Sequence, residues 1–269
     1  MRKIFLCGKN SYNGCPLRGC LNDIQNMADY LISEYGIAKK EIRMLTDGRA
    51  TTAAEKEHLA WLADGAQDGD FLLWHNSGHG STLAIRDTVG NVTTEHDCEC
   101  PIDFDFTPDH AILDTDVMSI FSKLPSGVNL RIILDSCHSG EMARAINGAG
   151  KIFAIRRFGY NQPQPMDLDW RIQTAKDLSI KAIGFSRSIE HLQGVLLAGC
   201  ESSGTSADAY IDRQYCGAFT YELLKTLRRN KEASLDSVIK STRVLLSTDG
   251  YEQIPQIHGL ESNQPFFVN

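Results

Sequence analysis

Short apolar runs alternate with amphipathic segments along most of this 269-residue chain. The runs are only a few residues long, as buried strands are, and the segments between them carry apolar side chains at the three- and four-residue spacing of helices. The runs of the strand type span residues 3–7, 42–45, 71–74, 130–134 and 195–198. This alternation predicts an α/β protein with a mostly parallel sheet and helices on both faces.

Four amphipathic segments are predicted to be helices. The first covers residues 21–35, and Thr51 with Glu55 marks the start of the second. Residues 218–229 and 235–246 follow the fifth apolar run with the same spacing, and residues 256–260 form a short final strand. The sequence therefore predicts about six strands in one layer.

Two segments interrupt the alternation. Residues 81–108 are rich in Asp, Glu, Thr and Gly, and we expect them to form a surface loop that borders a functional site. Residues 141–192 carry several glycines and the run Asn-Gln-Pro-Gln-Pro. Connections of this length in a compact domain are usually functional or mobile.

Composition and charge exclude several classes of protein. The apolar fraction of 42% is enough for a full core. The formal net charge is -7, and no basic cluster could follow a phosphate backbone. The first apolar stretch is only a strand long, and no run could cross a bilayer. We expect a soluble, cytoplasmic protein without nucleic-acid or membrane partners.

The chain contains eight cysteines. A long chain without an export signal favours reduced thiols over disulfides. Cys98 and Cys100 could supply half of a zinc site, but no second Cys/His pair with matching spacing accompanies them. Most of the cysteines are therefore expected to be free.

Two of the apolar runs end in polar turns, one with His79 and Gly80 and the other with Cys137. The carboxyl ends of parallel strands meet at one edge of a sheet, so His79 and Cys137 should face each other there. An imidazole can take the proton of a thiol, and the N–H groups of Gly80 and Cys137 can stabilise an oxyanion. We predict a Cys-His dyad that requires no cofactor. His75 has the same facing as His79 but is only a distant second candidate base, because packing within the apolar strand explains it better.

Four motifs resemble those of caspase-like cysteine peptidases, in particular metacaspases and bacterial orthocaspases. They occur in the family's order and span most of the chain. They are Ser-Gly-His-Gly at 77–80, Asp-Ser-Cys-His-Ser-Gly at 135–140, Leu-Arg-Gly-Cys-Leu-Asn-Asp at 17–23, and Ala-Gly-Cys-Glu-Ser-Ser-Gly-Thr-Ser-Ala-Asp at 198–208 with Gly-Ala-Phe-Thr at 217–220.

The resemblance implies a caspase-like three-layer α/β/α sandwich that forms a single peptidase domain over residues 1–269. Its large-subunit-like part is 1–140, its linker is 141–192 and its small-subunit-like part is 193–269. It further implies a cysteine endopeptidase that acts as a monomer on proteins or peptides. Two alternatives stay open: a catalytically silent caspase-like interaction module, against which the intact dyad argues, and a peptidase with another P1 preference.

The resemblance also implies cleavage after Arg or Lys, with Asp23 and Asp135 as the acids of the S1 pocket and Cys20 and Ser77 as further lining residues. A carboxylate pair in a cleft attracts a guanidinium and offers it bidentate hydrogen bonds. On local sequence alone, Asp23 could equally be an acid of the first helical turn.

The resemblance also implies calcium activation, which many metacaspases need, with orthocaspase-like independence as the alternative. The preference for Arg or Lys implies self-cleavage, with a solvated surface loop as the alternative explanation of the basic residues. Oxygen ligands for calcium are available at Asp87, Glu95, Asp97 and Glu99, but the dense Asp-rich run of the family is missing, so an acidic solvated loop competes with this hypothesis. An enzyme that cuts after basic residues could cut itself within 141–192. The candidate positions are Arg156, Arg157, Lys181 and Arg187.

Overall fold

The structure is a computed structural model that describes residues 1–86, 92–137, 144–146, 152–156, 194–201 and 206–268. Its centre is a six-stranded sheet in the order β13-β10-β7-β3-β1-β2. Five strands are parallel, and β13 runs antiparallel to β10. The strands are β1 (Arg2–Gly8), β2 (Ile42–Thr46), β3 (Phe71–Ser77), β7 (Asn129–Asp135), β10 (Val195–Ala198) and β13 (Gln256–His258). All six predicted strands are thus confirmed.

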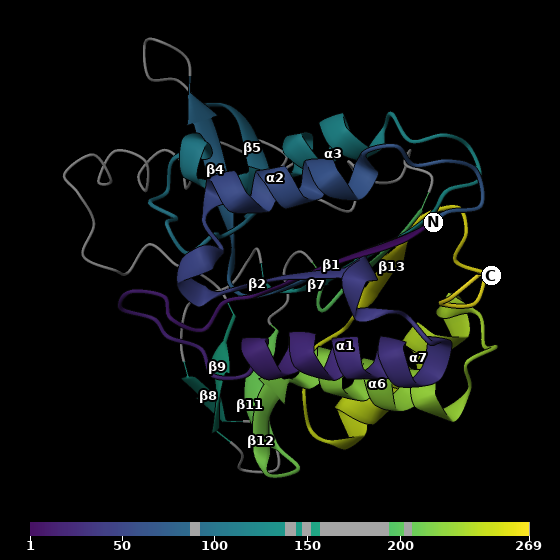
Figure 1. Cartoon of the computed structure of the whole chain (residues 1–269). Coiled ribbons are helices and arrows are strands. Elements are labelled where there is room, and N and C mark those ends of the chain that lie inside the picture. Colours follow the sequence, from purple (N-terminus) through teal and green to yellow (C-terminus); the bar gives the residue numbers. More distant parts are fainter. Residues whose placement is uncertain (87–91, 138–143, 147–151, 157–193, 202–205, 269) are drawn as a thin grey trace.

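Helices cover both faces of this sheet (Figure 1). On one face lie α1 (Cys20–Tyr35), α6 (Ala218–Arg229) and α7 (Leu235–Thr248), and on the other α2 (Thr52–Ala63) and α3 (Asp114–Phe121). Short 3₁₀ turns are found at Lys39–Glu41, Asp47–Arg49 and Pro108–His110. The result is the predicted three-layer α/β/α sandwich, with α3 as a helix that the sequence pattern did not indicate.

Alternation along the strands divides the core into two layers. In β1, Ile4 and Leu6 pack into a cluster with residues of α1, α6 and α7, whereas Phe5 packs into the cluster under α2 and α3. Every residue of β3 is buried, as expected for a central strand covered on both faces. The sheet is therefore a rigid platform whose strand ends have fixed relative positions.

Two smaller sheets border the carboxyl ends of the parallel strands, at the left in Figure 1. The first contains β4 (Gly80–Arg86), β5 (Val92–Glu99) and β6 (Ile112–Leu113). The second contains β8 (Arg144–Ile146), β9 (Ile152–Ile155), β11 (Ala207–Ile211) and β12 (Gln214–Gly217).

The prediction of a surface loop at 81–108 was wrong, because most of this segment forms the β4–β5 hairpin. Leu83, Cys98 and Phe104 are buried in a third apolar cluster, together with Phe106. The pairing between β4 and β5 and this burial stabilise strands whose own composition is largely polar. Part of 141–192 also forms strands, since β8 and β9 pair with each other and β9 pairs with β11.

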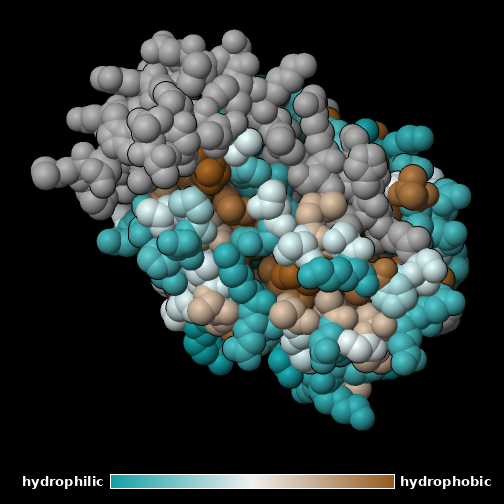
Figure 2. Space-filling model, turned by 90° about the horizontal axis from the view of Figure 1, so that it is seen from above, coloured by the Kyte–Doolittle hydropathy of each residue, from teal (hydrophilic) through white to brown (hydrophobic). Residues whose placement is uncertain are grey.

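Figure 2 views the molecule from the side of α2 and α3. Hydrophilic residues are interspersed there with small apolar groups. In the described part of the chain, no helix is long and apolar enough to cross a membrane.

Candidate active site

The predicted nucleophile and base lie at the ends of adjacent strands. β3 and β7 are paired so that Ser77 lies opposite Asp135, and both strands end at these residues. His79 and Cys137 each follow two residues later, and both are buried. The sheet register therefore brings the two turns side by side.

The surroundings of His79 define its protonation. Its Nε2 lies 2.8 Å from the carbonyl oxygen of Cys15, and because a carbonyl can only accept, Nε2 carries the proton. The imidazole packs on the ring of Tyr12 with 4.6 Å between centroids, and its backbone N–H donates to the Tyr12 hydroxyl. Burial lowers the pKa of His79 to about 4. The imidazole is thus neutral at pH 7, with Nδ1 as the basic nitrogen.

Cys137 lies against the start of β11. Its Sγ is 3.5 Å from the carbonyl oxygen of Ser206, and the Ser206 N–H points at the sulfur. Cys200 is close by, with its Sγ 3.4 Å from the carbonyl oxygen of Ser136. The thiol therefore lies where the 1–140 and 193–269 parts of the chain meet.

The backbone of Arg156 occupies the space between the two turns. Its carbonyl oxygen accepts from the N–H of Cys137 at 2.9 Å and from the N–H of Gly80 at 3.2 Å. Its own N–H donates to the carbonyl oxygen of Ser206 at 3.0 Å. Two donors from different strand ends thus converge on one carbonyl oxygen, which is the arrangement an oxyanion hole requires.

The Arg156 side chain is fully buried in an acidic pocket. Its Nη2 lies 2.7 Å from Asp23 Oδ2 and 2.9 Å from Asp208 Oδ1. Its Nη1 lies 2.5 Å from Ser77 Oγ and 3.6 Å from Asp135 Oδ2. The pocket therefore has the chemistry of a guanidinium site.

The pocket is held together by further hydrogen bonds. Asp23 accepts from Ser77 Oγ at 2.7 Å and from the Gly217 N–H at 2.8 Å. Asp135 accepts from Thr220 Oγ1 at 2.6 Å. A side chain at Gly217 would not fit, since its Cβ would lie 2.1 Å from Asp135 Oδ2. Burial raises the pKa of Asp23 to about 6, although the guanidinium opposes this shift.

The structure brings together most of the residues predicted for S1. Asp23, Ser77 and Asp135 contact Arg156, and Cys20 is fully buried in the first turn of α1. Asp208 was missed, although it ends one of the motifs noted in the sequence. Arg156 was considered only as a residue of an open loop, and nothing in its local sequence indicates burial. The other self-cleavage candidates, Arg157, Lys181 and Arg187, lie outside the described residues.

A buried polar network lies directly behind the dyad. Lys9 Nζ is 2.8 Å from Glu55 Oε1 and 2.9 Å from Asn76 Oδ1. Asn76 Nδ2 donates to Glu99 Oε2, and Ser136 Oγ donates to Glu99 Oε1 at 2.7 Å. Asn76 and Ser136 belong to the two segments that lead to His79 and Cys137. The network therefore joins these segments through fully buried side chains.

The predicted calcium ligands do not form a common site. Glu99 is fully buried in the network, Asp97 accepts from Thr82 Oγ1 at 3.1 Å, and Glu95 is partly exposed. Asp87 lies outside the described residues. Among the residues that are described, no three His, Cys, Asp or Glu side chains are grouped to hold a metal ion. Glu95, Asp97 and Glu99, the described candidates, therefore do not form a calcium site with one another.

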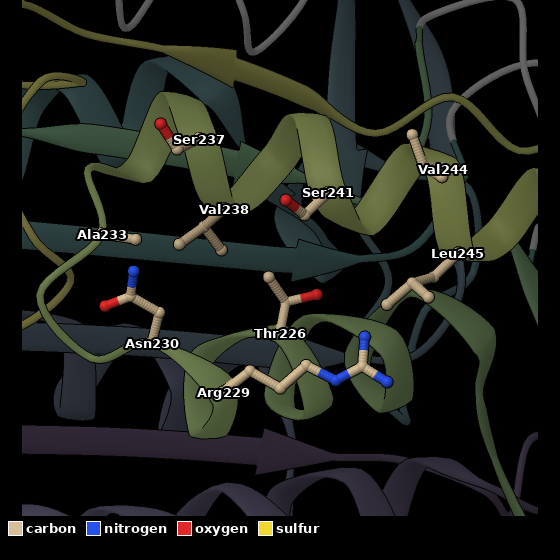
Figure 3. Close-up of a pocket in the computed structure, with 9 residues that line it drawn as sticks. All are labelled: Thr226, Arg229, Asn230, Ala233, Ser237, Val238, Ser241, Val244 and Leu245. Carbon is tan, nitrogen blue, oxygen red and sulfur yellow. The ribbon is translucent and has the colours of Figure 1, made fainter.

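Two other features lie away from the dyad. His75 is buried against Thr220, and burial lowers its pKa to about 4. A hollow of about 360 Å³ lies between α6 and α7, with Thr226, Arg229 and Val238 among its lining residues (Figure 3). It opens at the last turn of α6, whereas the first turn contacts Asp135, so it is separate from the acidic pocket around Arg156.

Known proteins resemble the chain over almost its whole length. Metacaspase-1 of Pyricularia oryzae is 28% identical over 99% of this chain and 74% of its own length, and metacaspase-1A of Aspergillus niger is 30% identical over 95% and 69%. The crystal structure of a Geobacter sulfurreducens protein superposes with a TM-score of 0.70 at 20% identity, covering 99% of this chain and 98% of that one, and shows the same fold.

A sequence model of one family matches residues 2–145, and it describes the metacaspase, peptidase C14 domain. This match spans more than half of the chain, and relatives of the same family extend it into the C-terminal part. The chain therefore belongs to the metacaspase family and is a cysteine-type endopeptidase.

Proposed function

We propose that the chain hydrolyses peptide bonds after Arg or Lys, with Cys137 as the nucleophile and His79 as the base. The observation that carries this proposal is the position of Arg156. Its guanidinium lies among Asp23, Asp135 and Asp208 while its carbonyl oxygen accepts from Gly80 and Cys137. A substrate bound in the same way would present its carbonyl carbon beside the Cys137 thiol.

The reaction follows from this geometry. His79 Nδ1 takes the proton of Cys137 Sγ, and the thiolate attacks the carbonyl carbon. The N–H groups of Gly80 and Cys137 stabilise the negative oxygen of the tetrahedral intermediate. The C–N bond then breaks, and the imidazolium protonates the leaving amine. Water gives a proton to His79 and attacks the thioester, and the thiol leaves with its proton restored.

Self-processing in 141–192 is part of the same proposal. Of the candidate bonds, Arg156–Arg157 has its carbonyl on the two N–H donors. The pairing of β9 with β11 holds the preceding residues as an antiparallel strand, with Ala207 opposite Ile155. We take Arg156–Arg157 as the bond that is cut first.

A single copy of one peptidase domain is sufficient for this chemistry. The described side chains around Arg156 all come from the same chain, and strands from 1–140 and from 193–269 lie in one sheet. These observations favour an active monomer that acts on protein or peptide substrates. Calcium has no role in the steps above.

The test is cleavage of fluorogenic peptides with Arg, Lys or Asp at P1. We expect the wild type to release the fluorophore after Arg and Lys, and Cys137→Ala and His79→Ala to lose this activity by at least about 10³-fold. Cys98→Ala, which removes another buried thiol, is the matched control and should retain activity.

If Cys98→Ala alone lost activity, or if Cys137→Ala turned over the peptides as fast as the wild type, Cys137 would not be the nucleophile. A wild type that cleaves nothing would favour the silent interaction module. Cleavage after Asp but not after Arg would favour the peptidase with another P1 preference.

A further inference from the structure

The carboxylate of Asp208 has a position in the pocket that the dyad and the two predicted S1 acids do not explain. It is the second residue of β11, is 4% exposed, and lies in register with Ala154 of β9 and Gly217 of β12. Its Oδ1 accepts from Arg156 Nη2 at 2.9 Å and from the Gly19 N–H at 2.8 Å. Its Oδ2 accepts from the Arg18 N–H at 2.9 Å.

We propose that Asp208 is a specificity-determining residue and that it makes the pocket select Arg over Lys. This inference rests on the proposed function, because it concerns the P1 residue of the same substrates. It adds two points to that function. The pocket prefers Arg to Lys, and Asp208, from the 193–269 part of the chain, is its third carboxylate.

The argument starts from the hydrogens of the guanidinium. Nη2 carries two, and it has two carboxylate neighbours from different elements, Asp23 of α1 and Asp208 of β11. Nη1 lies on the other side of the pocket, beside Ser77 Oγ and the backbone oxygen of Asp135 at 3.3 Å. A planar, forked cation satisfies both sides at once.

A lysine cannot reproduce these contacts. Its stem carries one nitrogen and is shorter than the Arg side chain, so an ammonium that reaches Ser77 leaves Asp208 without a cation. The carboxylate would keep its hydrogen bonds from the Arg18 and Gly19 N–H groups, but a buried charge that loses its cationic partner disfavours binding strongly. We expect a preference for Arg of about 10- to 100-fold.

A purely structural role for Asp208 is the competing explanation. Gly19 precedes α1 and has no side chain to cap the helix, and Asp208 accepts the N–H groups at this turn. The packing is tight, since a Cβ on Gly19 would lie 2.5 Å from Asp208 Oδ1. Such a role predicts loss of stability without any change in the choice between Arg and Lys.

The first experiment compares kcat/KM for two peptides that differ only in Arg or Lys at P1, for the wild type and for Asp208→Asn. Asparagine keeps the size and an acceptor oxygen but removes the charge. We expect the Arg-to-Lys ratio to fall at least about tenfold, through loss of Arg cleavage. Asp114→Asn, a fully buried carboxylate beside His96 and outside the pocket, should leave the ratio unchanged.

The second experiment measures binding without catalysis. In a protein with Cys137→Ala and Arg156→Ala, the amidated peptide Ile-Phe-Ala-Ile-Arg and its Lys analogue are titrated by calorimetry. We expect the Arg peptide to bind at least about tenfold more tightly, and Asp208→Asn to remove the difference.

Equal affinities for the two peptides, binding of neither, or an unchanged ratio in Asp208→Asn would overturn the assignment. Selective binding of the Arg peptide, lost in Asp208→Asn, would support it even if the wild type showed no Cys137-dependent turnover. That combination would instead reject the proposed function.

Discussion

At the scale of single residues, burial decides which groups are charged. His75 and His79 are both fully buried, and burial lowers the pKa of each to about 4 from the ordinary value of 6.5. In the acidic pocket, by contrast, a buried cation is present. The carboxylates of Asp23, Asp135 and Asp208 surround the single guanidinium of Arg156. A neutral base beside a concentrated negative charge is consistent with attack by a thiol on a substrate whose P1 side chain is cationic.

These histidines predict a loss of stability in acid. The unfolded chain protonates them near pH 6.5, whereas the folded chain does so only near pH 4. Between these values the unfolded state binds more protons, so the free energy of unfolding falls as the pH falls. Each histidine should contribute roughly 3 kcal/mol to this decline.

The measurement is urea denaturation of the wild type and His75→Gln at several pH values between 4 and 7. The variant should show a shallower decline, whatever its stability at pH 7. His58→Gln, which changes a half-buried histidine of α2, serves as the control and should follow the wild type. An unchanged slope in His75→Gln would contradict this account.

At the scale of elements, the sheet was predictable and the site only in part. The five parallel strands are apolar enough to be recognised without any tertiary information. The β4–β5 hairpin was not recognised, since its sequence is largely polar and its stability comes from packing against the cluster around Leu83. The short helix α3 was not recognised either, and it is held by Val117 and Phe121, which pack into the cluster that it shares with α2. The burial of Arg156 depends on its contact with Asp23 and Asp208, which are far away in the sequence, so no local pattern could predict it.

The network behind the dyad predicts a large cost for removing one charge. Burial raises the pKa of Glu55, and the ion pair with Lys9 opposes this shift. Lys9→Met leaves Glu55 buried without its cation, which should lower the free energy of unfolding by about 3–5 kcal/mol. The matched control is Lys56→Met, because Lys56 pairs with Asp116 at the surface and such pairs contribute about 0–1 kcal/mol. Chemical denaturation measures both variants. Equal losses in the free energy of unfolding for Lys9→Met and Lys56→Met would contradict a special role for the buried Lys9–Glu55 pair.

At the scale of the whole molecule, both parts of the chain contribute residues to the candidate site. The 1–140 part supplies His79, Cys137 and two acids of the pocket, while the 193–269 part supplies Ser206 and Asp208. β10 and β13 extend the sheet beside β7 and so fix these contributions relative to one another. The acidic pocket around the Arg156 guanidinium is therefore incomplete without the C-terminal part.

We propose that calcium bound by Glu95, Asp97 and Glu99 is not needed for activity. Glu95, Asp97 and Glu99 are not grouped so as to hold a metal ion together. Both carboxylate oxygens of Glu99 already accept hydrogen bonds, one from Asn76 and one from Ser136. Cleavage of an Arg peptide should therefore change less than about twofold between excess EGTA and millimolar calcium. Activity that appears only with calcium would show that ligands beyond these three residues form a site.

If Arg156 is bound as a P1 residue opposite Cys137, the wild type should cleave its own chain after Arg156. Purified wild type and Cys137→Ala are incubated, and the products are identified by intact mass and N-terminal sequencing. We predict that the wild type yields one fragment ending at Arg156 and another beginning at Arg157, and that Cys137→Ala remains intact. An uncut wild type, equal cutting of both proteins, or cuts that leave Arg156–Arg157 intact would contradict the claim.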